Sequence, residues 1–205
     1  MGHLASGVRF GGGPPAPAGS VVDDFEYADS IANHGWTFGA GTSDAQVFTS
    51  TEQFFNGARS MKSVRGAGAG AHELRFFNPP RTGDYDYEVA IYDTGFTTGQ
   101  AATYFAVRDD AGLANIGSGG INTYSSTTHY WVSDGVSTNT SHPRTNGWHV
   151  FRFQRTGTLQ NIYIDGTLRL STTVSSVAID SLFHASFNDA GGAFHSFLDF
   201  VRSLT

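Results

Sequence analysis

Three acidic residues occupy alternate positions in one short segment, at Asp84, Asp86 and Glu88. Alternate side chains of a β-strand share a face, so these carboxyl groups would lie together and could share a proton. A retaining glycosidase needs two carboxyl groups about 5 Å apart, one as nucleophile and one as acid. This segment is the chain's nearest approach to such a pair.

Other catalytic and metal-binding patterns are absent from the sequence. The eight histidines show neither H-x-H nor H-x-x-x-H spacing, which would place two imidazoles on one metal ion. The lack of cysteine excludes disulfides, thiolate ligands and thiol nucleophiles. There is no G-x-S-x-G elbow, and no glycine-rich segment precedes a lysine and a helix. We therefore expect no enzyme of these classes.

The charge pattern argues against nucleic acid as a partner. The 205 residues carry a formal net charge of -6, and Lys62 is the only lysine. Thinly spread basic residues form no positive stripe that could offset a phosphate backbone. No run of 18 apolar residues could span a membrane, and the first ten residues lack the basic start and apolar stretch of a secretory signal. We expect neither a membrane span nor a classical export signal.

Short runs rich in β-branched and aromatic residues recur along the chain, with turn-forming residues between them. This pattern predicts an all-β, two-sheet antiparallel sandwich with no helix beyond a turn near 50–55. Asp165-Gly166 favours the positive φ angles of a two-residue hairpin turn. The expected strands are 21–27, 45–49, 59–64, 72–77, 85–93, 103–108, 114–117, 121–124, 129–132, 148–155, 160–164, 168–172, 179–187 and 194–203.

The face opposite the core mixes aromatic rings with charges in two of these strands. Alternation in 85–92 and 103–108 places bulky apolar residues on one face, which we assign to the core. The other face carries Glu88, Tyr92, Tyr104 and Arg108. Such a mixture is typical of the open side of a sandwich that holds a polar ligand. An ordinary solvated face would have the same pattern.

Aromatic side chains would stack on sugar rings if a glycan binds, while arginine and histidine would hydrogen-bond its hydroxyls. The segment 124–131 adds three aromatic residues and a histidine close to polar loops. Core packing is the alternative role for each ring, and we assign Trp36 and Trp148 to the core. The expected contact residues are Tyr92, Tyr104, Arg108, Tyr124, His129, Tyr130 and Trp131.

The chain divides into a Gly/Pro-rich arm at 1–20 and a domain at 21–205. The arm has no apolar periodicity, and a segment so poor in hydrophobic residues usually becomes ordered only when a partner surface holds it. We expect it to act in assembly through Val8, Arg9 and Phe10. The alternative is an arm folded back on its own domain.

Four segments together resemble a known superfamily: VVDDFEYADSIANHGW, FFNGARSMKSV, GWHVFRFQRTGTLQNIYIDGTL and FLDFVRSL. They are similar to the concanavalin A-like lectin/glucanase superfamily, which includes laminin-G-like domains and laminarinase-type glucanases. The resemblance implies a jelly roll of two curved antiparallel sheets. It also implies that the first and last strands are adjacent and that the concave face is available for glycans.

The resemblance to the laminarinase-type branch also implies one structural calcium ion where the chain ends meet. Its ligands would be Asp199, the carbonyl of Gly57 and an oxygen from the Asp24 to Glu26 region. Calcium takes six to eight oxygens, so these three donors are an incomplete cage. The alternative is that Asp199 only hydrogen-bonds to a neighbouring strand or to solvent. The catalytic E-x-D-x-x-E pattern of this branch is absent, so we expect no enzyme.

These features favour a non-enzymatic, lectin-like structural protein of a tailed virus, as a tail-fibre, baseplate or capsid-surface component. It would contact host surface glycans, form a homo-oligomer on the virion surface and join other virion proteins through its arm. One alternative is an extracellular carbohydrate-binding module of a secreted glycan-degrading system. Another is a glycoside hydrolase or lyase with an unorthodox site.

Overall fold

The computed structural model describes residues 20–39, 41–65, 71–81, 83–97, 101–109, 114–136, 138–174, 178–188 and 194–205. Within these ranges the chain forms β-strands and one short 3₁₀ helix, η1 (Ile31–His34). The strands are β1 (Ser20–Asp23), β2 (Trp36–Phe38), β3 (Val47–Ser50), β4 (Ser60–Arg65), β5 (Ala71–Arg81), β6 (Tyr85–Asp93), β7 (Ala101–Asp109), β8 (Ala114–Asn122), β9 (His129–Ser133), β10 (Thr138–Pro143), β11 (Gly147–Thr156), β12 (Leu159–Ile164), β13 (Thr167–Thr173), β14 (Ile179–Asn188) and β15 (Phe194–Ser203).

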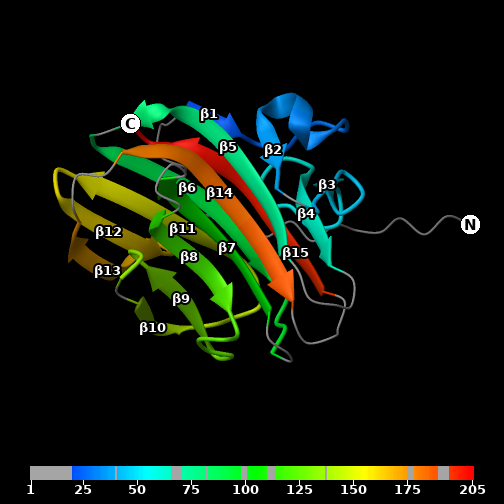
Figure 1. Cartoon of the computed structure of the whole chain (residues 1–205). Helices are drawn as coiled ribbons and strands as arrows, with labels where there is room; N and C mark the ends of the chain where they lie inside the picture. The colour runs from blue at the N-terminus through cyan, green and yellow to red at the C-terminus, as the bar shows by residue number, and fades with distance from the viewer. Residues whose placement is uncertain are drawn as a thin grey trace, which may run out of the picture.

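Two antiparallel sheets pack face to face. Sheet A has the order β13-β12-β11-β6-β15-β4-β3, and β1 pairs with β15 beside this path. Sheet B has the order β10-β9-β8-β7-β14-β5-β2. Figure 1 looks onto sheet B, where the orange strand β14 lies between β5 and β7. The all-β sandwich that the sequence predicts is confirmed.

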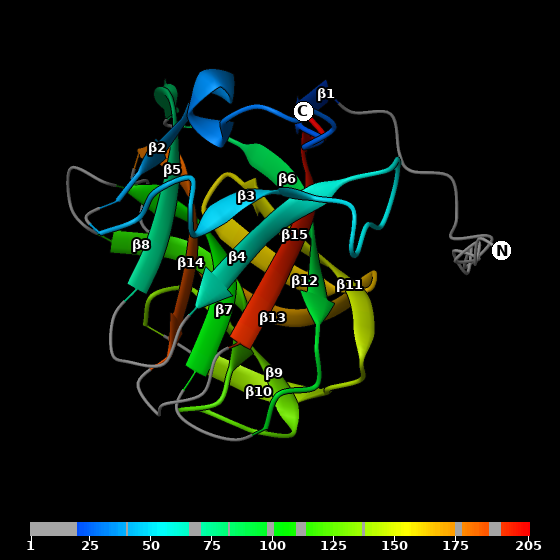
Figure 2. The same cartoon turned by 90° about the vertical axis from the view of Figure 1, so that its right-hand side faces the viewer.

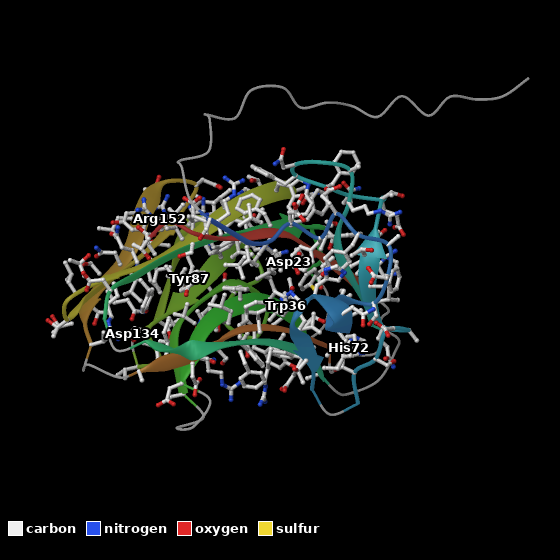
Figure 3. The ribbon with its side chains drawn as sticks, turned by 90° about the horizontal axis from the view of Figure 1, so that it is seen from above. Asp23, Trp36, His72, Tyr87, Asp134 and Arg152 are labelled. Carbon is white, nitrogen blue, oxygen red and sulfur yellow. The ribbon has the colours of Figure 1, made fainter. Side chains whose placement is uncertain are left out.

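The core lies between the two sheets. Tyr85, Tyr87, Phe105 and Val107 are all buried there, so the face assignment of 85–92 and 103–108 is confirmed. Trp36 joins them from β2, and Figure 3 shows Trp36 and Tyr87 between the layers. Large rings that fill this space supply much of the buried apolar area that stabilises the sandwich.

Two local predictions are also confirmed. Asp165 and Gly166 have φ angles of 50° and 74°, which are the positive values that a tight hairpin turn between β12 and β13 needs. The first strand, β1, pairs with the last strand, β15, and Ser20 lies opposite Ser203. Figure 2 shows β1 beside the C-terminus.

Some strand boundaries differ from the sequence prediction. The first strand ends at Asp23, because Phe25 has a φ of 57° and breaks the extended backbone. The segments predicted at 114–117 and 121–124 are not two strands, because one strand, β8, runs from Ala114 through the intervening glycines to Asn122. The prediction omitted two strands, the three-residue β2 and the polar β10. The turn near 50–55 is non-helical, and the short helix is η1 instead.

Trp148 does not belong to the core as predicted. It lies half-buried in β11, where the buried side chains are those of the alternate residues His149, Phe151 and Phe153. Its ring packs against Tyr92, with 5.2 Å between the ring centroids. Trp148 therefore covers the outer surface of sheet A.

Candidate functional site

Aromatic side chains gather on the outer surface of sheet B around Tyr104 of β7. Ring centroids of Trp131, Phe183 and Phe187 lie 5.7, 6.0 and 6.3 Å from that of Tyr104. Tyr124 extends the group, 5.4 Å from Phe187. We call these five residues the aromatic face.

The strand order brings the aromatic face together. β14 pairs with β7 so that Ala185 lies opposite Tyr104, and this small side chain leaves room for the larger rings. On the other side of Tyr104, Gly120 of β8 lies between it and Trp131 of β9. Because Gly120 has no side chain, the two rings can meet across an intervening strand. A Cβ atom at Gly120 would lie 2.3 Å from the Thr103 carbonyl oxygen, so this position requires glycine.

Two arginines flank the aromatic face. The guanidinium carbon of Arg108 lies 4.6 Å from the ring centroid of Phe183, and that of Arg75 lies 5.7 Å away. Both groups are placed for cation-π contact with this ring. Arg75 also pairs with Glu73 at 3.3 Å. The face thus combines apolar rings with hydrogen-bond donors and a carboxylate acceptor.

Tyr104 keeps a neutral hydroxyl group. Burial raises the pKa of its phenol, although a hydrogen bond with Asn115 and the charge of Arg108 oppose this effect. The uncharged hydroxyl can both donate and accept a hydrogen bond. A neutral polyhydroxylated ligand would use both properties.

The structure brings together four of the seven predicted contact residues. Tyr104, Arg108, Tyr124 and Trp131 lie on or beside the aromatic face. His129 begins β9, two residues before Trp131, and its Nδ1 atom lies 2.9 Å from the Thr128 hydroxyl. Alternation places its side chain on the same side of the sheet as Trp131.

The remaining two predicted contact residues, Tyr92 and Tyr130, lie away from the aromatic face. Tyr92 and Glu88 belong to β6 of sheet A, so the single face expected for them with Tyr104 and Arg108 does not exist. The reason is topological, because β6 and β7 follow each other in the chain but belong to opposite sheets. Tyr130 is buried in the core, and its hydroxyl donates to the Thr145 carbonyl at 2.8 Å.

Sequence reasoning missed Phe183, Phe187, Arg75 and Glu73. Alternation in 72–77 could have placed Glu73 and Arg75 opposite the buried Leu74. No comparable signal exists for β14, because its apolar residues occupy both faces. Its place between β5 and β7 was likewise invisible in the sequence.

The acids at Asp84, Asp86 and Glu88 lie far from the aromatic face, on the outer side of sheet A. Arg152 binds both oxygens of Asp86, at 2.7 and 2.5 Å. Burial raises the pKa of Glu88, although Arg152 and Arg202 oppose this effect. Figure 3 shows Arg152 at the outside of the sandwich. Asp84 accepts the Gly157 backbone N–H at 2.7 Å. Asp86 is therefore paired with an arginine and Asp84 with a backbone group, which differs from a free acid and base pair.

Of the residues named for calcium, Asp199 and Gly57 lie near each other, together with Glu26 from the named 24–26 region. The Asp199 carboxylate accepts hydrogen bonds from the backbone N–H groups of Phe55, Asn56 and Phe200. Burial raises the pKa of Asp199 to about 6. Glu26 approaches Gly57, where a Cβ atom would lie 2.0 Å from its Oε1 atom.

N–H groups thus point at the carboxylate where calcium would need oxygen ligands. Asp24 lies apart in its own turn, where its carboxylate accepts the Glu26 N–H at 3.2 Å. As they stand, these residues do not fit a calcium cage, and the ion stays a prediction. The described part of the chain holds no cluster of three or more histidine or acidic residues suited to a metal ion.

The arm residues Val8, Arg9 and Phe10 lie outside the described residues. Within the described ranges, no helix has the length and apolar character needed to cross a membrane.

The fold is shared with proteins that act on or recognise carbohydrates. No protein-family model and no curated protein matches the sequence. Among solved structures, a sialidase has a TM-score of 0.68 at 10% sequence identity. The match covers 91% of this chain but only 18% of the sialidase chain. A glycoside hydrolase family 16 endo-glucanase from Bacteroides ovatus has a TM-score of 0.61 at 12% identity, covering 88% and 98%. The carbohydrate recognition domain of Emp47p has a TM-score of 0.58 at 9% identity, covering 88% and 92%.

The chain has the concanavalin A-like jelly-roll fold. Identities of this size show the fold alone, and function must be argued from the site. The chain spans only 18% of the length of the sialidase.

Proposed function

We propose that this concanavalin A-like domain binds glycans on the aromatic face. The observation that carries the proposal is the group of five rings on the outer surface of sheet B, flanked by two arginines. Sugar rings stack on aromatic side chains, while their hydroxyls need fixed donors and acceptors. The carbohydrate-binding and glycan-cleaving proteins that share the fold support this reading.

Each part of the face has a role in this proposal. Trp131 would stack on a sugar ring, and Tyr104, whose ring is inclined by 75° to that of Trp131, would contact the edge of that sugar. Tyr124, the most exposed of the five at 41%, would extend the platform. Arg108 and Glu73 would hydrogen-bond the hydroxyls as donor and acceptor. Their contacts with neighbouring side chains hold them in place before the ligand arrives, which lowers the entropy cost of binding.

The test is binding to a glycan microarray, followed by calorimetric titration with the best-bound glycan. Trp131→Ala should weaken binding about tenfold or more, because the loss of one stacking ring removes about 1.5 kcal/mol. Leu168→Ala is the matched control, since it truncates another exposed apolar side chain on sheet A. Equal affinities for the two variants would place the glycan elsewhere.

The proposal does not include catalysis. Arg152 occupies both oxygens of Asp86, whereas a retaining mechanism needs two available carboxyl groups about 5 Å apart. Incubation with the bound glycan should therefore release no reducing ends. Release that survives the Asp86→Asn exchange would reveal a catalytic pair elsewhere in the chain.

The biological setting is a further part of the proposal: a virion attachment protein that is held in an oligomer by its arm. It is supported by the Gly/Pro-rich composition of residues 1–20, and a carbohydrate-binding module is the alternative. Light scattering on the full chain and on residues 20–205 tests it. An oligomer that dissociates when the arm is removed supports an assembly role, whereas a monomer in both cases supports the module.

A further inference from the structure

A hollow of about 380 Å³ lies on the opposite side of the sandwich from the aromatic face. Its apolar lining consists of Tyr92, Phe96 and Phe197. Its polar lining consists of Glu52, Gln53, Thr94 and His195. The volume is near the lower end of the range of ligand sites, about 300–1,000 Å³, which suits a single sugar residue.

The floor of the hollow belongs to a continuous row across sheet A. Lys62, Phe197, Tyr92 and Trp148 are register neighbours on β4, β15, β6 and β11. The ring centroids of Phe197 and Tyr92 lie 5.9 Å apart, and Lys62 Nζ lies 5.6 Å from the Phe197 ring. Figure 2 shows β15 beside β4, the strands that carry Phe197 and Lys62. The floor is therefore part of the rigid sheet.

One wall is the segment that follows β6. Arg144 binds both oxygens of Asp93 at 2.8 Å, and this ion pair is almost fully buried. The same guanidinium donates to the Phe96 carbonyl and lies 5.1 Å from the Phe96 ring. Arg144 thus fixes Phe96 in place at the edge of the hollow.

Glu52 and Gln53 contribute a second wall, from the loop between β3 and β4. Asp199 accepts two of its N–H groups, from Phe55 and Asn56, and Glu26 accepts those of Ala58 and Arg59. Asp199 thus ties the loop to β15, and Glu26 ties it to the segment that follows β1. Both walls are therefore formed before any ligand binds.

The charges in the hollow favour a neutral ligand. Three aromatic rings beside an acid could hold a cation, but the buried ammonium of Lys62 already contacts Glu52 and Phe197. The hydrogen bond from Lys62 lowers the pKa of Glu52, so this carboxylate stays ionised. Glu52 is still 56% exposed and can accept bonds from hydroxyl groups. Gln53 and His195 add donors at the rim.

We infer that the hollow is a second carbohydrate site, which takes one neutral hexose residue of a glycan. The C–H face of the sugar packs on Tyr92 and Phe96, and its hydroxyls bond to Glu52 and Gln53. This site is independent of the aromatic face, because the two lie on different sheets.

The test uses the three tryptophans as reporters, after incorporation of 5-fluorotryptophan into the full chain. Trp148 packs on Tyr92 and reports on the hollow, Trp131 reports on the aromatic face, and the buried Trp36 is an internal reference. Tryptophan-to-phenylalanine variants assign the fluorine resonances. The probes are the methyl glycosides of glucose, galactose and mannose at millimolar concentrations, with tetramethylammonium chloride as the cationic probe.

At least one glycoside should shift the Trp148 resonance, and tetramethylammonium should not. Gln53→Ala and Phe96→Ala should each raise the Kd of the glycoside, measured from the Trp148 shift, by about tenfold. The Trp131 shift should stay unchanged in both variants. The inference is overturned if no glycoside shifts Trp148, if only tetramethylammonium does, or if both variants respond like the original chain. If glycosides shift the Trp148 resonance of the original chain but not the Trp131 resonance, the proposed function of the aromatic face is contradicted and the hollow remains a carbohydrate site.

Discussion

Asp23 should be among the most sensitive positions in the domain, because its buried carboxylate joins three groups from the start of the chain. Its Oδ2 atom accepts the Trp36 indole N–H at 2.6 Å and the Tyr27 hydroxyl at 2.9 Å. Its Oδ1 atom accepts the Phe25 backbone N–H at 2.8 Å. These bonds hold the backbone where Phe25 takes its positive φ of 57°.

Asp23→Ala would strand two buried donors, the Trp36 indole and the Phe25 N–H. Each buried donor left without a partner costs about 1–3 kcal/mol, so the expected loss of unfolding free energy is about 2–6 kcal/mol. The Tyr27 hydroxyl is only part-buried and can turn to water. A loss of this size is a large fraction of the total stability of a domain, about 5–15 kcal/mol.

The assay is urea unfolding followed by circular dichroism and tryptophan fluorescence. Asp24→Ala is the matched control, because this exposed neighbour makes one surface hydrogen bond to the Glu26 N–H at 3.2 Å. It should lose less than about 0.5 kcal/mol. If Asp23→Ala also lost less than about 1 kcal/mol, the buried bonds would not stabilise the fold as argued.

Three further outcomes can be measured by thermal or chemical unfolding. Burial lowers the pKa of His184 to about 4, below its value of about 6.5 in the unfolded chain. The unfolded chain therefore binds a proton first, and the free energy of unfolding should fall by about 3 kcal/mol as the pH drops from about 6.5 to about 4. A His184→Gln variant should lose less stability over the same pH range. Gly120→Ala should cost about 2 kcal/mol or more, because its Cβ would meet the backbone of β7, whereas Gly83→Ala, which has open space, should be neutral. Replacing EDTA by calcium should leave Tm unchanged, since N–H groups face Asp199; a rise that disappears in Asp199→Asn would establish the ion.

Local patterns in the sequence were enough to predict the fold class and many of its faces. Alternation placed Tyr87 and Phe105 in the core, and Asp165-Gly166 marked its hairpin, because both signals depend only on neighbouring residues. The same rule applied to β11 would have put Trp148 outside, since His149 and Phe151 alternate with it on the buried side. The core assignment of Trp148 came instead from its place inside a segment that resembles the superfamily.

The candidate site could be predicted only in part, because it depends on which strands become neighbours. Tyr104 and Trp131 meet across Gly120, and Phe183 joins them only because β14 inserts between β5 and β7. No local pattern carries that order. The same topology separates Tyr92 from Tyr104, although only eleven residues lie between them in the chain.

This separation has a consequence if both sites bind. The aromatic face and the hollow open on opposite sides of two sheets whose backbones pack about 10 Å apart, so a short oligosaccharide cannot reach both. A short oligosaccharide therefore gains no avidity from the second site. One domain can, however, bind two separate glycan chains and so link them. A single domain would then cross-link a polymeric glycan, and its mixture with that polymer should turn turbid. An oligomer held by the arm would stay multivalent with one site per subunit, so this test uses residues 20–205 in monomeric form. There, either Trp131→Ala or Phe96→Ala should abolish the turbidity while leaving binding at the other site intact.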